Sequence, residues 1–425
     1  MGSEAKCLDY PPNISHLSAT LQLFSKNSGR THQKLSNEPR YRSPIKGDLY
    51  RGSLLNFWCV RPVILEEKIA AIEDDLSQVS LPNLEDIEAK GLNLTPGFMD
   101  QHVHITGGGG EGGPETRCPE LQLSELILCG TTSVVGVLGT DGLSRTPSSV
   151  LAKSRALKRE GISAWMHTSS YLLPPQTLTG SVKGDLYCVP EVLGVKIALG
   201  DHRSSFPTAE KLLEVLTDIR VSAMLAGKIG FLHIHLGDVP GAFNLLEEIV
   251  DRGFPIKHIR PMHVARKKWL LQDAIGFARK GGFIDVTSGG ICDFSSPADA
   301  VEILFDEKVP PHLLTMSTDG HGSKPRFNEN GELIGLRCGG VTGNLDIVRE
   351  LIGRGHAPEK ILPLVTSNVA DALGLGGKGK ISAGFDADIC FFDTDCDWKL
   401  RSVFARGKQH LSEGELLKKG TFEEL

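Results

Sequence analysis

The stretches LGVKIALGD (residues 193–201) and GFLHIHLGD (residues 230–238) decide the fold class. Each is an apolar run of strand length that ends in Gly-Asp. Between them, leucine and isoleucine recur at helical spacing from Leu212 to Ile219, which predicts an amphipathic helix. A strand, a helix and a second strand in this order predict a βαβ unit with both strands parallel in one sheet.

The same alternation continues in both directions along the chain. Its eight apolar runs end at His104, Thr140, Tyr171, Asp201, Asp238, Val264, Gly290 and Gly320. Eight such units at intervals of roughly 25 to 40 residues favour a closed (β/α)8 barrel of α/β class, with an open doubly wound sheet as the alternative.

The segments that flank these repeats differ in composition. Residues 1–58 are polar and show no sustained strand or helix period, so we predict an irregular or atypical N-terminal segment. Short strand-like pieces separated by turn residues occur at 59–95 and again at 376–425. We expect these two parts to pair into one small composite β-domain, with the barrel over residues 96–375.

Composition narrows the class of protein. Lys plus Arg number 46 and Asp plus Glu 52, so the net charge of −6 argues against nucleic acid or an anionic membrane as the main partner. No apolar run approaches the ~18 residues of a membrane-spanning helix, and the N-terminus lacks the apolar core of a secretory signal. We therefore expect a cytoplasmic protein. Nine single cysteines without a C-x-x-C pair fit reduced thiols and argue against a cysteine zinc site.

Five residues of the type that binds metals are expected at the carboxyl ends of four barrel strands, where such barrels carry their active sites. They are His102, His104, His235, His263 and Asp319. His102 and His104 stand two apart on one strand and so point to the same face. A lone H-x-H pattern is a weak signal, but packing does not readily explain five such residues at one mouth.

Lys196 lies inside the apolar run VLGVKIALG and has two interpretations. Its stem could pack in the core while its amine reaches the rim. Next to a metal, however, the amine can react with carbon dioxide to form a carbamate whose anionic oxygens bridge two ions. The chain then offers a binuclear site of histidine, carboxylate and carbamate, which suits zinc.

These stretches resemble the metal-binding motifs of the amidohydrolase superfamily. The resemblance lies in GFMDQHVH, the lysine of GVKIALGDHRS, the histidines of HIHLGD and RPMHV, and the aspartate of STDGHGS. More narrowly, QHVHITGGGGEGGPETRCPE, TTSVVGVLGTDGLSR, AWMHTSSY, TGSVKGD and ISAGFDADI resemble the isoaspartyl dipeptidase (β-aspartyl peptidase) family, from near Val60 to the C-terminus. The resemblance implies a homo-oligomeric zinc metallopeptidase that cleaves small β-aspartyl dipeptides.

The resemblance also implies a role for each site residue. It assigns one zinc ion to His102, His104 and Asp319, the second to His235 and His263, and both to carbamylated Lys196. Water bridging the two ions would be deprotonated near neutral pH and held for attack on the amide carbonyl. Asp319 would pass the proton of this water to the leaving amine, and Tyr171 would polarise the carbonyl or stabilise the oxyanion.

A β-aspartyl dipeptide carries one ammonium group and two carboxylates, and the sequence offers complementary charges. Glu111, on the glycine-rich loop after His104, suits the ammonium group. Arg203 and Arg266 suit the carboxylates, because a guanidinium group binds a carboxylate in bidentate fashion. By family resemblance the pocket also contains Gly109, Gly110, Thr140 and Ser323.

Three functional hypotheses follow: the active dipeptidase, a hydrolase of another amide such as a cyclic imide or an N-acyl amino acid, and a catalytically silent barrel scaffold. The joint presence of Glu111, Tyr171 and the two arginines argues against the second, and the complete ligand set argues against the third. GGGGEGG also matches the dinucleotide fingerprint G-x-G-x-x-G, but it follows H-x-H and lacks a recognisable ribose-binding acid. We expect His233 to lie behind the metal ligands rather than among them.

Overall fold

The computed structural model describes residues 41–42, 45–49, 58–73, 85, 87–290, 292–328 and 333–423. Arg40–Leu425 form one unit of the chain. The other unit, Met1–Pro39, lies outside the described residues, and so does most of the segment that we predicted to be irregular.

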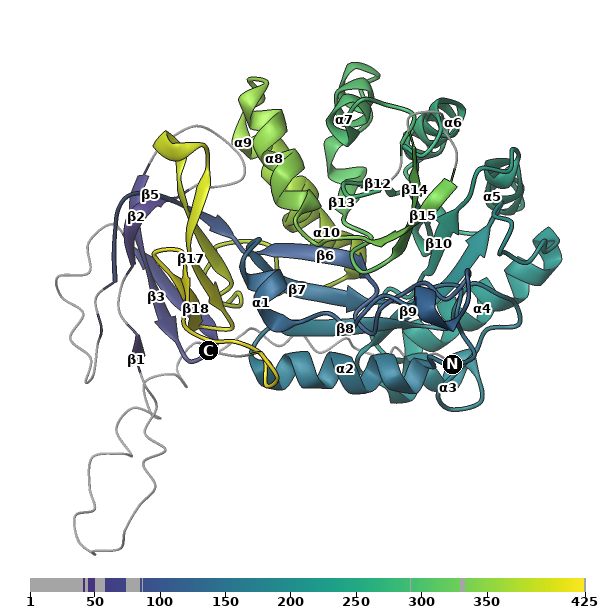
Figure 1. The fold of residues 1–425 in the computed structure, drawn as a ribbon, viewed down its shortest axis with the longest axis horizontal. Coiled ribbons are helices and arrows are strands. Elements are labelled where there is room, and N and C mark those ends of the chain that lie inside the picture. The colour runs from purple at the N-terminus through teal and green to yellow at the C-terminus, as the bar shows by residue number, and fades with distance from the viewer. Residues whose placement is uncertain are drawn as a thin grey trace, which may run out of the picture. The chain divides into compact units, whose positions relative to one another are not determined.

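Eight parallel strands form the centre of the described part (Figure 1). In chain order they are β6 (Phe98–Val103), β7 (Thr131–Gly136), β8 (Ser163–Thr168), β9 (Val192–Leu199), β10 (Leu232–Leu236), β11 (Ile259–Met262), β12 (Ile284–Thr287) and β13 (Leu314–Ser317). The first six pair in chain order, and β12 pairs with β13. Two contacts bring the remaining neighbours together: Val264 N donates to Asp285 O at 3.2 Å, and His104 N donates to Gly320 O at 2.9 Å. The predicted barrel fold is confirmed.

Helices connect the strands and lie around them in Figure 1. They are α1 (Leu123–Ile127), α2 (Pro147–Glu160), α3 (Val182–Cys188), α4 (Ala209–Leu225), α5 (Ala242–Asp251), α6 (Lys268–Arg279), α7 (Pro297–Asp306), α8 (Gly343–Gly353), α9 (Pro358–Ile361) and α10 (Ser367–Leu373). Local sequence sets their ends: α7 begins with Pro297 behind Ser296, whose hydroxyl accepts a hydrogen bond from Ala298 N.

The barrel strands are buried on both faces, because helices cover their outer sides while the inner sides face one another. All eight residues of β9 and all five of β10 are buried. Ile197 and Ile234 pack in one cluster with helix residues such as Leu216 and Leu246. Any charged residue in these strands, including Lys196, is therefore also removed from water.

A second sheet combines the two ends of the described chain. Its strands are β1 (Tyr41–Arg42), β2 (Ile45–Leu49), β3 (Trp58–Leu65), β4 (Lys68–Glu73), β5 (Ile87–Pro96), β16 (Ile389–Asp393), β17 (Lys399–Ala405), β18 (Lys408–Ser412) and β19 (Glu415–Leu416). Strand β5 pairs antiparallel with β16, so Ile389 lies opposite Pro96. The predicted composite sheet of N- and C-terminal segments is confirmed.

This sheet reaches further back along the chain than we expected. Strands β1 and β2 lie within residues 1–58, and β2 pairs with both β3 and β5. Their sequences, YR and IKGDL, are too short and too polar to show an apolar alternation. The domain boundaries at residues 96 and 375 remain predictions.

Lys378 joins this sheet to the amino-terminal end of the barrel. Its buried ammonium group lies 2.7 Å from Asp386 Oδ2 and 2.6 Å from Asp388 Oδ2. It also donates at 2.6 Å to the hydroxyl of Ser163, the first residue of β8. Because two carboxylates and a hydroxyl surround it, this buried charge is fully paired.

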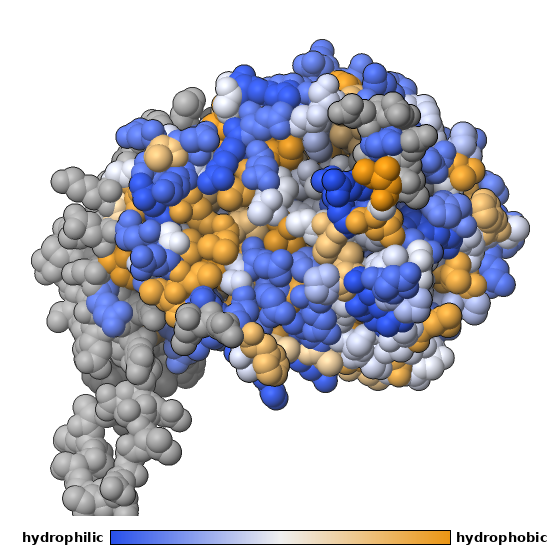
Figure 2. All heavy atoms as spheres, viewed as in Figure 1, coloured by the Kyte–Doolittle hydropathy of each residue, from blue (hydrophilic) through white to orange (hydrophobic). Residues whose placement is uncertain are grey.

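The hydropathy of the surface and of the helices can be compared with the expectation that the chain does not span a membrane. Most of the face in Figure 2 is hydrophilic, with a larger apolar area near β17 and β18. Among the described residues, none of the helices has the length and apolar character needed to cross a bilayer.

Candidate active site

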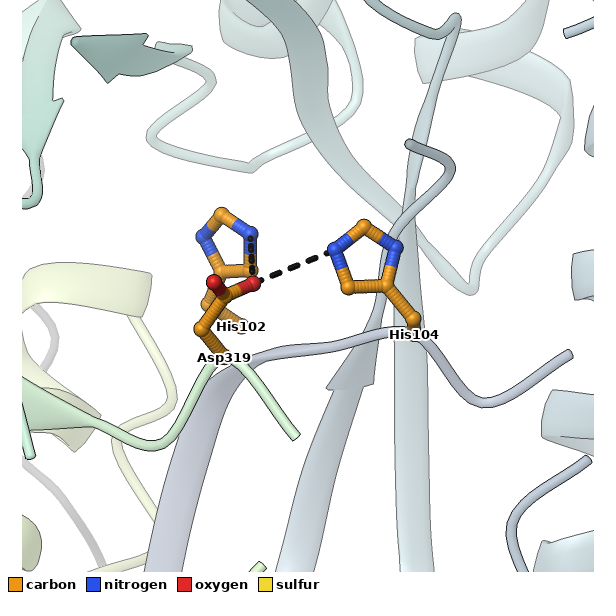
Figure 3. Close-up of side chains that lie close together, drawn as sticks. All are labelled: His102, His104 and Asp319. Atoms are coloured by element: carbon orange, nitrogen blue, oxygen red, sulfur yellow. Dashed lines mark hydrogen bonds and ion pairs between the residues drawn. The ribbon is translucent and has the colours of Figure 1, made fainter. Parts of the chain in front are cut away.

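Three potential metal ligands converge at the carboxyl end of the barrel (Figure 3). His102 is in β6, His104 follows it directly, and Asp319 follows β13. Asp319 Oδ1 lies 3.4 Å from His102 Nε2 and 3.2 Å from His104 Nε2. Their ligand atoms all lie within 4.8 Å of one another, so these three residues form a candidate metal site.

Lys196 adjoins this group from β9. Its fully buried amine nitrogen lies 3.1 Å from His102 Nε2. Burial lowers the pKa of the amine to about 7, and the nearby charge of Asp319 offsets only part of this effect. A substantial fraction of the amine is therefore neutral near pH 7, and the neutral amine is the form that can react with carbon dioxide.

His235 in β10 and His263 after β11 lie next to each other, with ring centroids 4.5 Å apart. Thr287 Oγ1 lies 2.6 Å from His263 Nδ1. His263 Nε2 is buried and has no hydrogen-bond partner among the described residues. Because buried polar atoms are normally satisfied, a free imidazole nitrogen here fits a ligand position for a metal ion.

The backbone conformation supports this arrangement. His263 has φ 64° and Asp319 has φ 52°, in the left-handed region that residues other than glycine rarely adopt. His263 is the first residue after β11, and Asp319 is the second residue after β13. Such strain is common where surrounding contacts hold functional side chains in place. Behind His102, His233 Nε2 lies 2.9 Å from His102 Nδ1, where it fixes the orientation of the ring.

A cavity of about 450 Å³ opens above these residues. The sequence-predicted residues in its lining are His104, Gly109, Glu111, Thr140, Tyr171, Arg203, His235, His263, Arg266, Asp319 and Ser323. His102 and Lys196 are fully buried and do not line it. Gly110 does not line it either; its amide donates to Thr116 O at 3.3 Å within the glycine-rich loop.

Asp201 lies at the centre of a group of charged side chains that line one side of the cavity, which we call the charged wall: Arg203, His235 and Arg266 all contact its carboxylate. The sequence motifs had not assigned a role to Asp201. It accepts two hydrogen bonds from Arg203, Nε to Oδ1 and Nη2 to Oδ2, both at 2.8 Å. Its Oδ2 also lies 3.1 Å from His235 Nε2 and 3.5 Å from Arg266 Nη1. Burial alone would raise the pKa of Asp201, but its bonds with Arg203 and His235 hold it well below the usual range. Its position at the end of an apolar strand was the one feature of the sequence that could have indicated a place in the active site.

Tyr171 and Glu111 complete this wall. The Tyr171 hydroxyl lies 3.0 Å from His235 Nδ1, and burial raises the pKa of the phenol above its ordinary value. The hydroxyl therefore stays protonated and can donate a hydrogen bond. Glu111 Oε1 lies 3.5 Å from Arg203 Nη1, so the acidic and basic groups predicted for substrate binding meet at one place.

Two further residues had not been assigned roles. Lys324 lines the cavity next to Ser323, and its buried ammonium group donates to Gly289 O. His321 points away from the metal ligands, with Nε2 3.0 Å from Glu125 Oε1 and Nδ1 3.0 Å from Pro119 O. Neither could be placed without knowing the path of the chain after Asp319.

A family model and solved structures both relate this chain to amidohydrolases. The model of the Amidohydrolase family matches residues 228–412. The β-aspartyl dipeptidase of Fervidobacterium islandicum AW-1, solved in complex with β-Asp-Leu dipeptide, is 35% identical and has a TM-score of 0.82 over 90% of this chain and 100% of that chain. A dihydropyrimidinase from Brevibacillus agri NCHU1002, at 17% identity and a TM-score of 0.60 over 89% of this chain and 96% of that chain, shows a shared fold.

Curated relatives match less of their own length. Adenine deaminase 1 of Latilactobacillus sakei is 21% identical over 83% of this chain and 54% of that protein. An allantoinase of Rubrobacter xylanophilus is 31% identical over 25% of this chain and 24% of that protein. The chain therefore spans about a quarter to a half of the length of these two curated relatives.

The curled parallel sheet, the His-His-Asp group at its mouth and the family match together define an amidohydrolase. The chain belongs to the amidohydrolase superfamily and, within it, to the isoaspartyl dipeptidase (β-aspartyl peptidase) family. The resemblance identified from the sequence motifs is confirmed.

Proposed function

We propose that this chain is a zinc-dependent isoaspartyl dipeptidase that hydrolyses β-aspartyl dipeptides. The observation that carries the proposal is the single cavity in which Glu111, Arg203 and Arg266 stand beside the metal-ligand group. The Fervidobacterium β-aspartyl dipeptidase, solved with β-Asp-Leu, supports the choice of substrate class. The family resemblance also implies a homo-oligomer.

The donor set suits two zinc ions. In this proposal His102, His104 and Asp319 would hold the first ion and His235 and His263 the second, and Lys196, once carbamylated, would supply anionic oxygen ligands. Imidazole nitrogens and anionic oxygens are ligands that zinc prefers, and the free Nε2 of His263 is consistent with such a role. Bound zinc supplies Lewis acidity that lowers the pKa of a water molecule towards neutrality.

Asp319 is suited to move the proton of that water. Burial would raise the pKa of its carboxyl group, but the contact with His104 and the charge of His263 keep it well below the usual range. The carboxylate is thus ionised at neutral pH and free to accept a proton, which it then delivers to the leaving amine. Tyr171 donates a hydrogen bond to the carbonyl oxygen as negative charge develops there.

Charge placement accounts for selection of the β isomer. Glu111 binds the ammonium group, Arg203 and Arg266 bind the two carboxylates, and Gly109, Gly110, Thr140 and Ser323 belong to the surrounding pocket and its glycine-rich loop. In the α isomer the scissile carbonyl is one carbon closer to the ammonium group. Binding that ammonium at Glu111 then moves the carbonyl away from the metal ligands, so we expect slow cleavage.

A panel of amides tests the proposal against the other hypotheses. Zinc-loaded protein is incubated with β-Asp-Leu, a cyclic imide and N-acetyl-leucine, with Glu111→Gln as the matched variant. We expect cleavage of β-Asp-Leu alone, and a higher KM in the variant because the ammonium group loses its charge partner. Cleavage of the imide or of N-acetyl-leucine alone would assign another amidohydrolase activity. Failure to retain any metal would favour a silent scaffold.

A further inference from the structure

A pair of cysteine thiols lies beside the substrate cavity and takes no part in the proposed reaction. Cys118 follows the glycine-rich loop, and Cys338 ends β15 (Leu333–Cys338). The two thiols lie close enough together to influence each other's ionisation. Both line a second cavity, which shares Glu111, Ser323 and Leu336 with the substrate cavity. The pair therefore adjoins residues to which we assign substrate binding.

The two sulfur atoms differ in accessibility and in ionisation. Cys338 is exposed, whereas Cys118 is buried. Its interactions with Cys118 and with His321 lower the pKa of the Cys338 thiol to about 5, although partial burial opposes the shift. An exposed thiolate beside a second thiol is the arrangement in which an oxidised sulfur can be captured as a disulfide.

Cys118 is mechanically linked to the glycine-rich loop. Its amide donates to Gly108 O at 2.8 Å, and Arg145 Nη2 donates to its carbonyl at 2.9 Å. Arg145 also donates from Nη1 to Gly108 O at 3.0 Å, and Gly109 forms a β-bridge with Arg117. A displacement of Cys118 is therefore transmitted to Gly109, which lines the substrate cavity.

Cys338 is linked to the same cavity through Ser323. In the antiparallel pair of β14 (Ser323–Phe327) and β15, Cys338 lies directly opposite Ser323. The amide of Gly339 donates to Gly322 O at 2.9 Å, three residues after Asp319. The two thiols thus belong to two segments that both contribute to the lining of the substrate cavity, one after β6 and one after β13.

We propose that Cys118 and Cys338 form a peroxide-sensitive dithiol whose oxidation to a disulfide changes substrate binding in the adjoining cavity. The Cys338 thiolate attacks one peroxide oxygen, so an S–O bond forms, the O–O bond breaks, and hydroxide leaves and is protonated to water. The Cys118 sulfur then attacks the sulfenic sulfur, forming the S–S bond and breaking the S–O bond; its own proton leaves with the oxygen as a second water. Two electrons pass from the thiols to the peroxide.

The disulfide does not depend on the proposed dipeptidase function, but its effect on substrate binding does. The experiment therefore has two readouts on the zinc-loaded full chain after treatment with hydrogen peroxide. Peptide mapping under non-reducing conditions detects the cross-link, and kinetics with β-Asp-Leu detect the functional effect. Cys338→Ser and Cys118→Ser are the test variants. Cys188→Ser and Cys396→Ser are matched controls, because both of these cysteines are also exposed.

We expect a Cys118–Cys338 cross-link in the parent and in both controls, but in neither test variant. KM for β-Asp-Leu should rise about tenfold in the cross-linked protein, with zinc content unchanged and full recovery after dithiothreitol, because small displacements of binding groups weaken catalysis strongly. Oxidation at Cys188 or Cys396 without the cross-link would overturn the proposal. A cross-link with unchanged KM would overturn its functional half, whereas reduced protein that never cleaves β-Asp-Leu would refute the dipeptidase function instead.

Discussion

Two buried lysines, one towards each end of the barrel, have opposite surroundings. Lys378, at the amino-terminal end, lies within 2.7 Å of Asp386 and within 2.6 Å of Asp388 and Ser163. Lys196, towards the carboxyl end, has His102 Nε2 at 3.1 Å, and no carboxylate of the described residues lies within ion-pair distance of it. Both side chains are almost fully removed from water.

The difference separates a structural charge from a reactive one. The charge of a buried ammonium group between two carboxylates is compensated, and the group fixes two segments against each other. A buried amine without such partners loses its proton more easily, as the lowered pKa of Lys196 indicates, and is available for covalent chemistry. Burial of the two side chains is similar, so the chemical character of the neighbours decides their roles.

Replacing Lys196 should give the largest effect. Lys196→Met keeps the length and apolar stem but cannot form a carbamate, so the second zinc ion loses an anionic ligand. We expect kcat to fall at least about 10⁴-fold, because metal catalysis contributes several kcal/mol to transition-state stabilisation. Zinc analysis by mass spectrometry should show loss of metal. Two bound zinc ions with normal turnover would show that the two lysines do not differ in the way described.

Lys378→Met should lower the stability of the fold but leave catalysis unchanged, the opposite of what we expect for Lys196→Met. Removing the ammonium group leaves Asp386 and Asp388 facing each other without a counter-charge, which should destabilise the fold by about 3–5 kcal/mol. Urea unfolding measures this loss. At temperatures where the variant is folded, kcat and zinc content should match the parent. The double variant Lys378→Met/Asp388→Asn should regain part of the lost stability, since one of the unpaired charges is removed.

Asp319→Asn separates zinc binding from proton transfer at the carboxyl end of the barrel. An amide oxygen can still coordinate a metal weakly but cannot accept a proton. We expect kcat to fall about 10³-fold while zinc content falls much less. Steady-state kinetics and metal analysis on the same preparation check this. Unchanged turnover would remove Asp319 from the role of base.

Arg266→Lys tests charge recognition with a smaller expected effect. Lysine keeps the positive charge but loses the bidentate geometry, so KM for β-Asp-Leu should rise about tenfold with a modest change in kcat. Arg252→Lys is the matched control, because Arg252 is exposed, pairs with Glu210 and Glu248, and does not line the cavity. Equal behaviour of the two variants would argue against substrate binding by Arg266.

The pH dependence of thiol labelling tests whether the neighbours of Cys338 lower its pKa, as the surroundings of Lys196 lower the pKa of its amine. The pKa of the Cys338 thiol is about 5 in the folded protein and about 9 without its partners, so between about pH 5 and pH 9 its thiolate predominates only in the native state. Iodoacetamide should therefore label Cys338 at a nearly constant rate from pH 6 to 8. In urea the rate should instead rise steeply with pH over this range. A steep rise in the folded protein as well would contradict the lowered pKa.

The sequence was sufficient for the barrel and for the convergence of three potential metal ligands at its mouth. Eight apolar runs with helical segments between them allow few topologies, and the carboxyl ends of parallel strands meet at one mouth, which brings His102, His104 and Asp319 together. Contacts that depend on side-chain direction could not be predicted. Asp201 joining Arg203 to His235 is one example, and the Cys118–Cys338 pair, 220 residues apart in sequence, is another.

Short and locally irregular features also escaped prediction. Strand β2 has five residues of mixed polarity and is held by its neighbours β3 and β5 rather than by its own pattern. Family resemblance places both Gly109 and Gly110 at the pocket; Gly109 lines the cavity, and Gly110 lies next to it in the glycine-rich loop. Contacts with residues distant in the sequence hold β2 in place, and a contact within the glycine-rich loop positions Gly110.

The most direct test of the central claim is the hydrolysis of β-Asp-Leu and α-Asp-Leu, measured as kcat/KM on one sample with quantified zinc. We expect cleavage of the β isomer alone, with close to two zinc ions per chain. Bound zinc with cleavage of neither peptide, or of both at equal rates, would contradict it.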